Sequence, residues 1–420
     1  MRGLVRQTSI YLGGVSGTRP RVPTDATKLE ERARRSMSRQ AFAYIAAGAG
    51  TEDTVAANRR AFDRWRIVPR MLRDVSERDP STELFGRRIP APLLLAPVGV
   101  LELAHREADR AVARAAREVG VPMVFSNQAS TPMETCASLL GDSPRWLQLY
   151  WSSSDELVES LVARAEACGC EAIVVTLDTT ILGWRPRDLD EAFLPFLRGK
   201  GIAQYTSDPV FLRLLDEDGS PAPGQQPKPT LQALRTLVQV GRAYPGGFVE
   251  ALRSGKARAA VQQFVRIYSR PTLTWDDLGW LRERTRLPIL LKGILHPDDA
   301  ARAVDAGMDG VVVSNHGGRQ VDGSIATLDA LPEVVAAVGG RVPVLLDGGV
   351  RGGADVLRAV ALGASAVLVG RPYVYGLAIA GEAGVREVLE NLVADFDLTM
   401  GLAGCRTVAE IGPETLRRLD

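Results

Sequence analysis

The chain has 420 residues, 45% of them hydrophobic, with 51 Lys and Arg against 50 Asp and Glu. This balance argues against a nucleic-acid binder or a polybasic membrane protein, because both need an excess of positive charge. No apolar stretch reaches the roughly 18 residues that span a bilayer, and the first residues lack the apolar segment of a signal peptide. We therefore expect a cytoplasmic protein with no membrane segment and no nucleic-acid partner.

The chain is expected to begin with an N-terminal arm over residues 1–30, a helical extension that precedes a single domain over residues 31–420. Four scattered cysteines, Cys136, Cys168, Cys170 and Cys405, show no zinc-site spacing and have no accompanying histidine pair. They indicate reduced structural thiols and no metal centre.

Short apolar runs typical of buried strands recur along the domain, and segments with helical periodicity lie between them. Apart from one long gap, the runs are spaced by about 20 to 35 residues, the length of one βα unit. The eight runs are residues 92–97, 121–126, 146–150, 172–178, 288–293, 311–314, 343–348 and 366–370. The clearest helical segments are residues 107–119, 154–167, 297–306 and 353–362. Eight such repeats predict an α/β fold, a (β/α)₈ TIM barrel, with a doubly wound open sheet as the alternative.

The long gap follows the fourth predicted strand, and we interpret residues 188–276 as an insertion over the rim of the barrel. Residues 221–229 are rich in Pro and Gln and typical of a linker, whereas residues 231–240 could form a short helix. An insertion in this place is often a lid. The alternative is a disordered loop or a loop that makes oligomer contacts.

Polar residues gather at or just after the ends of the predicted strands, where a barrel of this type carries its chemistry. Ten residues at the same end are more than strand capping explains: Ser126, Gln148, Tyr150, Thr176, Asp178, Lys292, His316, Arg319, Asp347 and Arg371.

His316 is the strongest catalytic candidate among three histidines, because it follows a buried strand and lies among glycines, three residues before Arg319. His105 and His296 stand at helix entries and are expected to be surface or capping residues. A histidine beside arginines suits a base next to an anion clamp, and Arg185 and Arg319 could each bind a carboxylate.

Further residues could complete such a site. Asp178 could orient His316 and stabilise its imidazolium form, and Lys292 could neutralise negative charge on a reduced cofactor. Glycines and arginines in residues 347–353 and at Gly370 and Arg371 could bind a phosphate, which barrels commonly do after strands seven and eight.

The residues 314–320, together with Asp322, resemble the active-site signature of the FMN-dependent 2-hydroxy-acid oxidases and dehydrogenases. Other segments fit the same family in order: residues 44–49 with Thr54, Asn58 and Arg59, residues 96–99, 148–150 and 176–178 with Arg185, residues 292–293, 347–351 and 370–372. The resemblance covers roughly residues 40–187 and 262–410 and leaves the insertion unmatched by most of the family.

The resemblance implies an FMN-containing barrel with defined roles for these positions. Residues implied to hold the cofactor are Ser126, Gln148, Thr176, Lys292 and Ser314 near the ring, Pro97, Val98 and Gly99 along one ring face, and Asp347, Gly349, Arg351, Gly370 and Arg371 at the phosphate. Tyr44, Tyr150, Arg185 and Arg319 would bind the hydroxy acid, with both tyrosines also in the catalytic set. His316 would be the base, backed by Asp178. Transfer of two electrons as a hydride or through a carbanion stays open.

Gly99 replaces the alanine that most oxidases of the family carry, and in this it resembles lactate 2-monooxygenase, as does the segment that follows Arg185. The implied reaction converts L-lactate and O₂ to acetate, CO₂ and water, because a retained keto acid can be decarboxylated by peroxide formed beside it.

Three alternatives remain open. One is an oxidase or quinone-linked dehydrogenase that releases the keto acid, and another is a pathway flavoenzyme acting on a larger hydroxy acid. The third, a non-catalytic FMN-binding protein, does not need the base. Relatives in this family also imply a homotetramer or homo-octamer.

Overall fold

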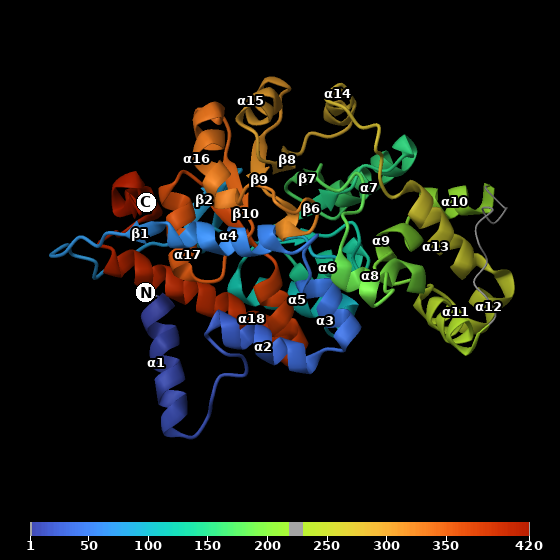
Figure 1. The fold of residues 1–420 in the computed structure, drawn as a ribbon, viewed down its shortest axis with the longest axis horizontal. Helices are drawn as coiled ribbons and strands as arrows, with labels where there is room; N and C mark the ends of the chain where they lie inside the picture. The colour runs from blue at the N-terminus through green and yellow to red at the C-terminus, as the bar shows by residue number, and fades with distance from the viewer. Residues whose placement is uncertain (1, 218–229, 420) are drawn as a thin grey trace.

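The computed structural model describes residues 2–217 and 230–419, and its centre is a closed barrel of eight parallel strands (Figure 1). The strand order around the barrel is β10-β11-β4-β5-β6-β7-β8-β9. The strands are β4 (Leu93–Leu95), β5 (Met123–Phe125), β6 (Arg145–Leu149), β7 (Ile173–Thr176), β8 (Ile289–Ile294), β9 (Gly310–Val313), β10 (Val344–Asp347) and β11 (Ala366–Val369). Each overlaps one of the eight predicted runs and extends beyond it by at most one residue, so the predicted (β/α)₈ barrel is confirmed and the open sheet is wrong.

Alternation along the strands divides the core into two parts, because successive side chains of a strand point to opposite faces. In β4, Leu94 belongs to the cluster that fills the barrel interior, whereas Leu93 and Leu95 belong to the larger cluster between barrel and helices. Both faces of each strand are therefore buried, which is why the strands appear in the sequence as unbroken apolar runs.

The helices that follow the strands cover the outside of the barrel. They are α5 (Ala108–Val119), α6 (Met133–Leu140), α7 (Asp155–Ala167), α15 (Pro297–Asp305), α16 (Thr327–Val338), α17 (Gly353–Ala361) and α18 (Arg371–Leu402). The four helical segments predicted most clearly are confirmed as α5, α7, α15 and α17. Non-helical backbone at Ala380 and Gly381 breaks α18 into two parts, and Gly381 adopts a φ of 59° that favours glycine.

Helices at the N-terminus precede the barrel: α1 (Arg2–Val15), α2 (Ala26–Ser36), α3 (Arg39–Ala46) and α4 (Asp53–Asp63). Both α1 and α2 pack against α18. The backbone N–H of Gly3 donates to Oδ2 of the buried Asp397 at 2.7 Å, and a Cβ atom at Gly3 would lie 2.6 Å from the carbonyl oxygen of Ala394. The predicted N-terminal arm is therefore helical and held on α18.

Two small antiparallel sheets were absent from the predicted elements. The strands β1 (Trp65–Ile67) and β12 (Leu416–Arg418) pair near the chain end, and β2 (Thr82–Leu84) pairs with β3 (Arg87–Ile89) in a hairpin. Leu84 and Ile89 of this hairpin join the interior cluster of the barrel, and Phe85 packs edge-on against Trp146 with ring centroids 5.7 Å apart. The hairpin thus seals the barrel interior at its amino-terminal end.

The predicted insertion lies between β7 and β8, and its described residues form short helices at one side of the barrel (Figure 1). These are α8 (Pro186–Asp190), α9 (Ala203–Thr206), α10 (Pro209–Glu217), α11 (Leu231–Ala243), α12 (Phe248–Ser254) and α13 (Lys256–Ile267), with a 3₁₀ turn, η2, at Pro195–Arg198. The helix α14 (Asp277–Arg282) follows the insertion and precedes β8. The helix predicted from residue 231 is confirmed as α11. The linker predicted at residues 221–229 lies outside the described residues.

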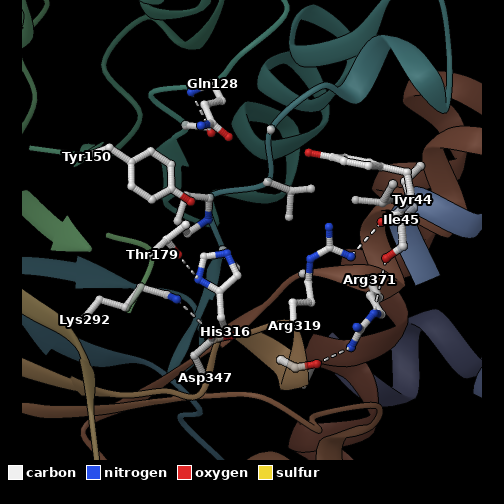
Figure 2. Close-up of a pocket in the computed structure, with 18 of the residues that line it drawn as sticks. Tyr44, Ile45, Gln128, Tyr150, Thr179, Lys292, His316, Arg319, Asp347 and Arg371 are labelled. Carbon is white, nitrogen blue, oxygen red and sulfur yellow. Dashed lines mark hydrogen bonds and ion pairs between the residues drawn. The ribbon is translucent and has the colours of Figure 1, made fainter. Parts of the chain in front are cut away.

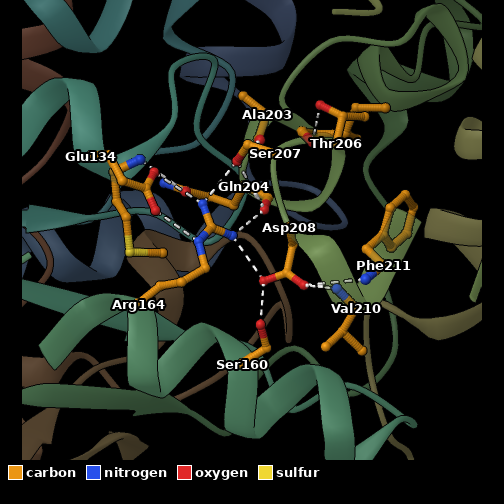
Figure 3. A network of polar contacts seen from close by, with 12 residues as sticks. Glu134, Ser160, Arg164, Ala203, Gln204, Thr206, Ser207, Asp208, Val210 and Phe211 are labelled. Atoms are coloured by element: carbon orange, nitrogen blue, oxygen red, sulfur yellow. Dashed lines mark hydrogen bonds and ion pairs between the residues drawn. The ribbon is translucent and has the colours of Figure 1, made fainter. Parts of the chain in front are cut away.

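An ion-pair network around the buried Asp208 ties the insertion to the barrel helices (Figure 3). Arg164 of α7 pairs with Asp208, which precedes α10, at 2.9 Å and with Glu134 of α6 at 2.8 Å. The Asp208 carboxylate also accepts hydrogen bonds from Ser160 Oγ and from the backbone N–H of Val210 at the start of α10, both at 2.9 Å. Asp208 is fully buried, so removing Arg164 would leave an uncompensated buried charge.

The structure also bears on the cysteines, on metal ligands, on membrane-spanning helices and on the two remaining histidines. All four cysteines are free thiols, and no group of His, Cys, Asp and Glu within residues 2–217 and 230–419 could hold a metal ion. None of the helices in those ranges has the length and apolar character required to cross a membrane. His296 is the N-cap of α15 and accepts a hydrogen bond from the backbone N–H of Asp298. His105 accepts one from the backbone N–H of Glu107, the residue before α5.

Candidate active site

A cavity of about 310 Å³ opens at the carboxyl ends of the barrel strands (Figure 2). Most predicted site residues line it: Tyr44, Pro97, Val98, Gly99, Ser126, Tyr150, Arg185, Lys292, His316, Arg319, Asp347, Gly349, Arg351, Gly370 and Arg371. Four others lie just behind the wall: Gln148, Thr176, Asp178 and Ser314. Segments from across the chain are thus brought to one place, as expected for the loops at this end of a barrel.

His316 is held by a carboxylate on the neighbouring strand end. Its Nδ1 atom lies 2.6 Å from Oδ1 of Asp178 and 3.1 Å from Oγ1 of Thr179, and Thr179 donates to the same carboxylate oxygen at 2.9 Å. An Nδ1–H that donates to Asp178 leaves the lone pair of Nε2 free to accept a proton. Thr179 was missed in the sequence, although its position directly after Asp178 was an available signal.

The protonation states of this pair suit a general base. Burial lowers the pKa of His316 below its usual 6.5, although the Asp178 carboxylate acts in the opposite direction. Burial would raise the pKa of Asp178, but His316 and Lys292 outweigh it and hold that pKa at about 2. At neutral pH the histidine is therefore neutral and the aspartate ionised.

Arg185 and Arg319 form the cationic side of the cavity. Arg319 donates through Nη1 to the carbonyl oxygens of Tyr44 at 2.6 Å and Ala47 at 2.9 Å, and its guanidinium carbon lies 5.2 Å from the centre of the Tyr44 ring. Arg185 donates from Nε to the carbonyl oxygen of Arg319 at 2.9 Å. These contacts fix both guanidinium groups and leave N–H groups for a carboxylate.

Gln320 is a positioning residue that the sequence interpretation quoted but gave no role. Its Oε1 accepts from Nη2 of Arg185 at 2.8 Å, and its Nε2 donates to the carbonyl oxygens of Asp178 and Ile181 at 2.7 and 2.9 Å. It therefore links the loop that carries Arg185 and Asp178 to the loop that carries His316. The signal was its place inside the segment 314–320.

Tyr44 and Tyr150 turn their rings toward the cavity from opposite sides (Figure 2). Burial raises the pKa of both hydroxyls, to about 12 for Tyr150. Both remain protonated at neutral pH and can donate hydrogen bonds to a bound acid.

A second polar cluster lies deeper, where Lys292, Ser314 and Asp347 meet. Lys292 Nζ lies 3.0 Å from both Asp347 Oδ2 and Ser314 Oγ, and Ser314 donates to Asp347 at 2.7 Å. Burial would lower the pKa of Lys292, but the Asp347 and Asp178 carboxylates raise it above its usual value. The lysine thus provides a fixed positive charge at the floor of the cavity.

Two observations test whether these residues fit a flavin mononucleotide. Gln148 Nε2 and Thr176 Oγ1 are buried beside the cavity and have no hydrogen-bond partner among the described residues, and such groups are costly unless a ligand binds them. Four arginines line the cavity without a carboxylate ion-pair partner in that same part of the chain: Arg185, Arg319, Arg351 and Arg371. The unpaired groups of Gln148 and Thr176 fit the polar edge of a flavin ring. The positive charge of the arginines fits a phosphate.

The phosphate end is formed by the loops after β10 and β11. Gly348 and Gly349 adopt φ values of 110° and 81°, and a Cβ atom at Gly349 would lie 2.5 Å from the carbonyl oxygen of Asn58, so no other residue fits there. Arg371 donates to the carbonyl oxygens of Gly317 and Ala47 at 3.0 and 3.1 Å. Burial lowers the pKa of Arg371 to about 10, which keeps it charged at neutral pH.

The insertion contributes an apolar wall to the cavity that the sequence did not reveal. Leu194 and Phe196 come from η2 and the residue before it, and Phe264, Val265 and Tyr268 come from α13 and the residue after it. The Phe196 ring lies 6.5 Å from that of Tyr44 and 5.1 Å from that of Phe264. In sequence these residues are indistinguishable from ordinary helix core.

Gly99 lies in the cavity wall opposite Gln128. A Cβ atom at Gly99 would lie 3.0 Å from both Cβ and the carbonyl oxygen of Gln128, and 3.5 Å from Oγ of Ser126. A methyl group there would displace Gln128 by a few tenths of an ångström and narrow the cavity.

Comparison with known proteins agrees with this arrangement. The profile of the FMN-dependent dehydrogenase family matches residues 33–418. The FMN-dependent alpha-hydroxy acid dehydrogenase qulF of Penicillium citrinum is 44% identical over 99% of this chain and 96% of its own length. L-lactate oxidase of Lysinibacillus sphaericus is 41% identical over 90% of this chain and 89% of its own. The crystal structure of mandelate oxidase with (S)-4-hydroxymandelic acid matches with a TM-score of 0.77 at 39% identity, covering 94% of this chain and 98% of that one.

Proposed function

The chain belongs to the FMN-dependent dehydrogenase family and is an FMN-dependent 2-hydroxy-acid oxidoreductase, and from this premise we propose that it oxidises an L-2-hydroxy acid with O₂ as the final acceptor. The observation that carries the proposal is the 2.6 Å contact between His316 Nδ1 and Asp178, because it presents a neutral Nε2 as a base beside two arginines.

In the proposed mechanism, Arg185 and Arg319 bind the substrate carboxylate, and Tyr44 and Tyr150 donate hydrogen bonds to it. His316 takes a proton from the hydroxy-acid carbon or its hydroxyl, and Asp178 stabilises the imidazolium that forms. Bound FMN supplies an acceptor for the two electrons of the oxidation. Lys292 offsets the negative charge that results.

The FMN would be held by the predicted cofactor residues. Gln148, Thr176, Ser126, Lys292 and Ser314 would surround the polar edge of the ring, and Pro97, Val98 and Gly99 would lie along one face. Asp347, Gly349, Arg351, Gly370 and Arg371 would bind the ribityl phosphate chain. The unpartnered Gln148 Nε2 and Thr176 Oγ1 support this assignment.

For the fate of the product we propose the reaction of a lactate 2-monooxygenase, in which L-lactate and O₂ give acetate, CO₂ and water. Gly99 supports this outcome because it lies in the cavity wall, where a methyl group would press on Gln128 and narrow the cavity in which a keto acid would stay while peroxide forms. The segment between β7 and β8 supports it as well, since five of its residues line the cavity.

A second candidate is an oxidase or dehydrogenase that acts on a larger hydroxy acid and releases the keto acid. The aromatic wall of Phe196, Phe264 and Tyr268 favours it, because the methyl group of lactate would contact little of that surface.

The homotetramer or homo-octamer and the cytoplasmic location predicted from the sequence remain part of the proposal. Light scattering after size-exclusion chromatography would measure the oligomeric state.

The first experiment is to mix the FMN-loaded protein with L-lactate without oxygen and to follow the visible absorbance of the flavin. Rapid bleaching would support lactate oxidation, and product analysis in air would then separate acetate from pyruvate with hydrogen peroxide. A flavin that bleaches with aromatic hydroxy acids alone would favour the second candidate. A flavin that no 2-hydroxy acid reduces would contradict the proposal.

A further inference from the structure

Asp188 is a partly buried carboxylate that the proposed mechanism does not use. It lies in α8, one turn after Arg185, and its backbone N–H donates to the carbonyl oxygen of Arg185 at 3.1 Å. Its own carbonyl oxygen accepts from the N–H of Phe193 at 2.9 Å. Its Oδ1 is buried and has no hydrogen-bond partner in the part of the chain that the structure describes. A buried carboxylate oxygen without a donor is costly, so a role for its charge is expected.

The Asp188 carboxylate lies on the side of the site that is expected to bind the substrate carboxylate. The helix α8 packs against α3, which carries Tyr44. Arg319 lies beside Tyr44, because its Nη1 donates to the Tyr44 carbonyl oxygen at 2.6 Å (Figure 2). Asp188 is therefore close enough to Arg185, Arg319 and Tyr44 for its charge to act on all three.

Neighbouring carboxylates are already paired. Asp178 contacts His316 at 2.6 Å, and Glu52 forms an ion pair with Arg187, the residue before Asp188. The Asp188 Oδ1 atom makes no such contact within the described ranges. Its charge is thus not taken up by a close partner there and acts on the two arginines of the site at longer range.

The charge state of Asp188 agrees with its position. Burial raises the pKa of its carboxyl group, whereas the positive charges of Arg319 and Arg185 act in the opposite direction and favour the ionised form. An ionised carboxylate near the arginine pair repels any further anion that binds to that pair, and the repulsion is strong where water is excluded.

A 2-hydroxy acid and the keto acid formed from it carry the same carboxylate. A pair of arginines binds both alike, and binding that substrate and product share does not speed the chemical step. We propose that Asp188 is a positioning residue that acts through Arg185 and Arg319: its negative charge weakens their hold on the carboxylate and so speeds release of the keto acid. The inference rests on the proposed 2-hydroxy-acid oxidation and adds how the same site limits its affinity for anions.

The test compares two ligands that differ in charge, pyruvate and its neutral amide, pyruvamide. Each is titrated into the oxidised, FMN-loaded protein at about pH 8, where carboxylates are ionised, and the flavin absorbance reports binding without turnover. Asp188→Asn should bind pyruvate roughly tenfold more tightly than the wild-type protein, the effect of removing one nearby like charge. The affinity for pyruvamide should stay unchanged.

Anaerobic reduction by L-lactate separates an effect on binding from an effect on chemistry. In Asp188→Asn the apparent Kd for L-lactate should fall roughly tenfold, whereas the rate constant at saturation should stay within about twofold of the wild-type value. A distorted active site would instead lower the rate constant.

Three further variants serve as controls. Asp190→Asn removes the same charge from an exposed position of α8 and should leave pyruvate binding unchanged. Asp188→Glu retains the charge and should retain the wild-type affinity. If Asp188→Asn does not fold or does not bind FMN, Asp188→Ser, which is also uncharged, tests the same expectation.

Unchanged or weaker pyruvate binding in a neutral Asp188 variant that binds FMN would overturn the proposal. Equal tightening of pyruvate and pyruvamide would overturn it as well, because it would indicate a reshaped cavity and not a removed charge. The two proposals can fail separately: tighter pyruvate binding without reduction by any acid would refute the oxidation alone. Normal reduction by L-lactate with an unchanged apparent Kd in Asp188→Asn would refute the role of Asp188 alone.

Discussion

His316 Nδ1 lies 2.6 Å from Asp178 Oδ1, although 138 positions separate the two residues in the chain. They follow β9 and β7, which both pair with β8, so the parallel barrel itself brings their loops together. His316 adopts a φ of 57°, uncommon for a residue with a side chain, and its N–H donates to Ser314 Oγ at 3.1 Å. Backbone strain of this kind clusters at functional sites.

Replacing His316 tests its role as the base. His316→Ala should bind FMN normally, because the contacts at Arg351 and Arg371 stay in place, and should reduce it roughly 100- to 10,000-fold more slowly. Anaerobic stopped-flow spectroscopy with an excess of substrate measures the rate. His296→Ala, which changes an exposed helix cap, is the matched control. Near-normal reduction by His316→Ala would remove this residue from the mechanism.

The pH dependence of flavin reduction follows from the lowered pKa of His316. A base must be deprotonated to act, and the deprotonated form dominates above the pKa, which lies below 6.5. The rate should therefore be constant above about pH 6.5 and fall about tenfold per pH unit below the pKa. Reduction rates in buffers of constant ionic strength measure this profile.

Asp178→Asn is the diagnostic variant for that profile. It removes the carboxylate that raises the pKa of His316, so the acidic limb should move to lower pH while the plateau falls, roughly 100-fold, as the imidazolium loses its support. A limb that moves to higher pH would show that a different group titrates.

Arg351 offers a test of the phosphate site. Among the residues that the structure describes, its guanidinium makes one hydrogen bond, from Nη1 to the carbonyl oxygen of the preceding Val350 at 3.0 Å. Arg351→Met should weaken FMN binding by about 10- to 100-fold, the effect of losing a charge-assisted hydrogen bond. Riboflavin, which lacks the phosphate, should bind with unchanged affinity. Fluorescence titration of the apoprotein measures both, and Arg386→Met, at a surface ion pair with Glu118, is the control.

Equal weakening of FMN and riboflavin binding by Arg351→Met would contradict a phosphate role. It would instead indicate that Arg351 supports the loop structure.

Much of the fold was predictable because each barrel strand is buried on both faces and therefore forms an unbroken apolar run. The cofactor and catalytic residues were predictable because they lie in short segments next to those runs, such as residues 314–320. The three-residue strands β1, β2, β3 and β12 are too short to show a two-residue period. Their pairing partners are also not evident from local sequence.

The substrate wall could not be predicted for a different reason. Phe196 and Phe264 lie in helical turns of the insertion, where an aromatic residue that faces a ligand and one that faces the core have the same periodicity. Gln128 belongs to no quoted motif, and its place in the cavity wall becomes visible only in the structure.

Gly99→Ala tests whether this glycine controls the fate of the product. The added methyl group would lie 3.0 Å from Gln128 Cβ and carbonyl oxygen, closer than ordinary van der Waals contact, and the narrowed cavity should release the keto acid sooner. With L-lactate in air, the products should shift from acetate and CO₂ to pyruvate and hydrogen peroxide. Gly279→Ala, where the new Cβ atom meets nothing within 4 Å, is the matched control. An unchanged ratio of acetate to pyruvate in Gly99→Ala would mean that contacts other than Gly99 retain the keto acid in the cavity.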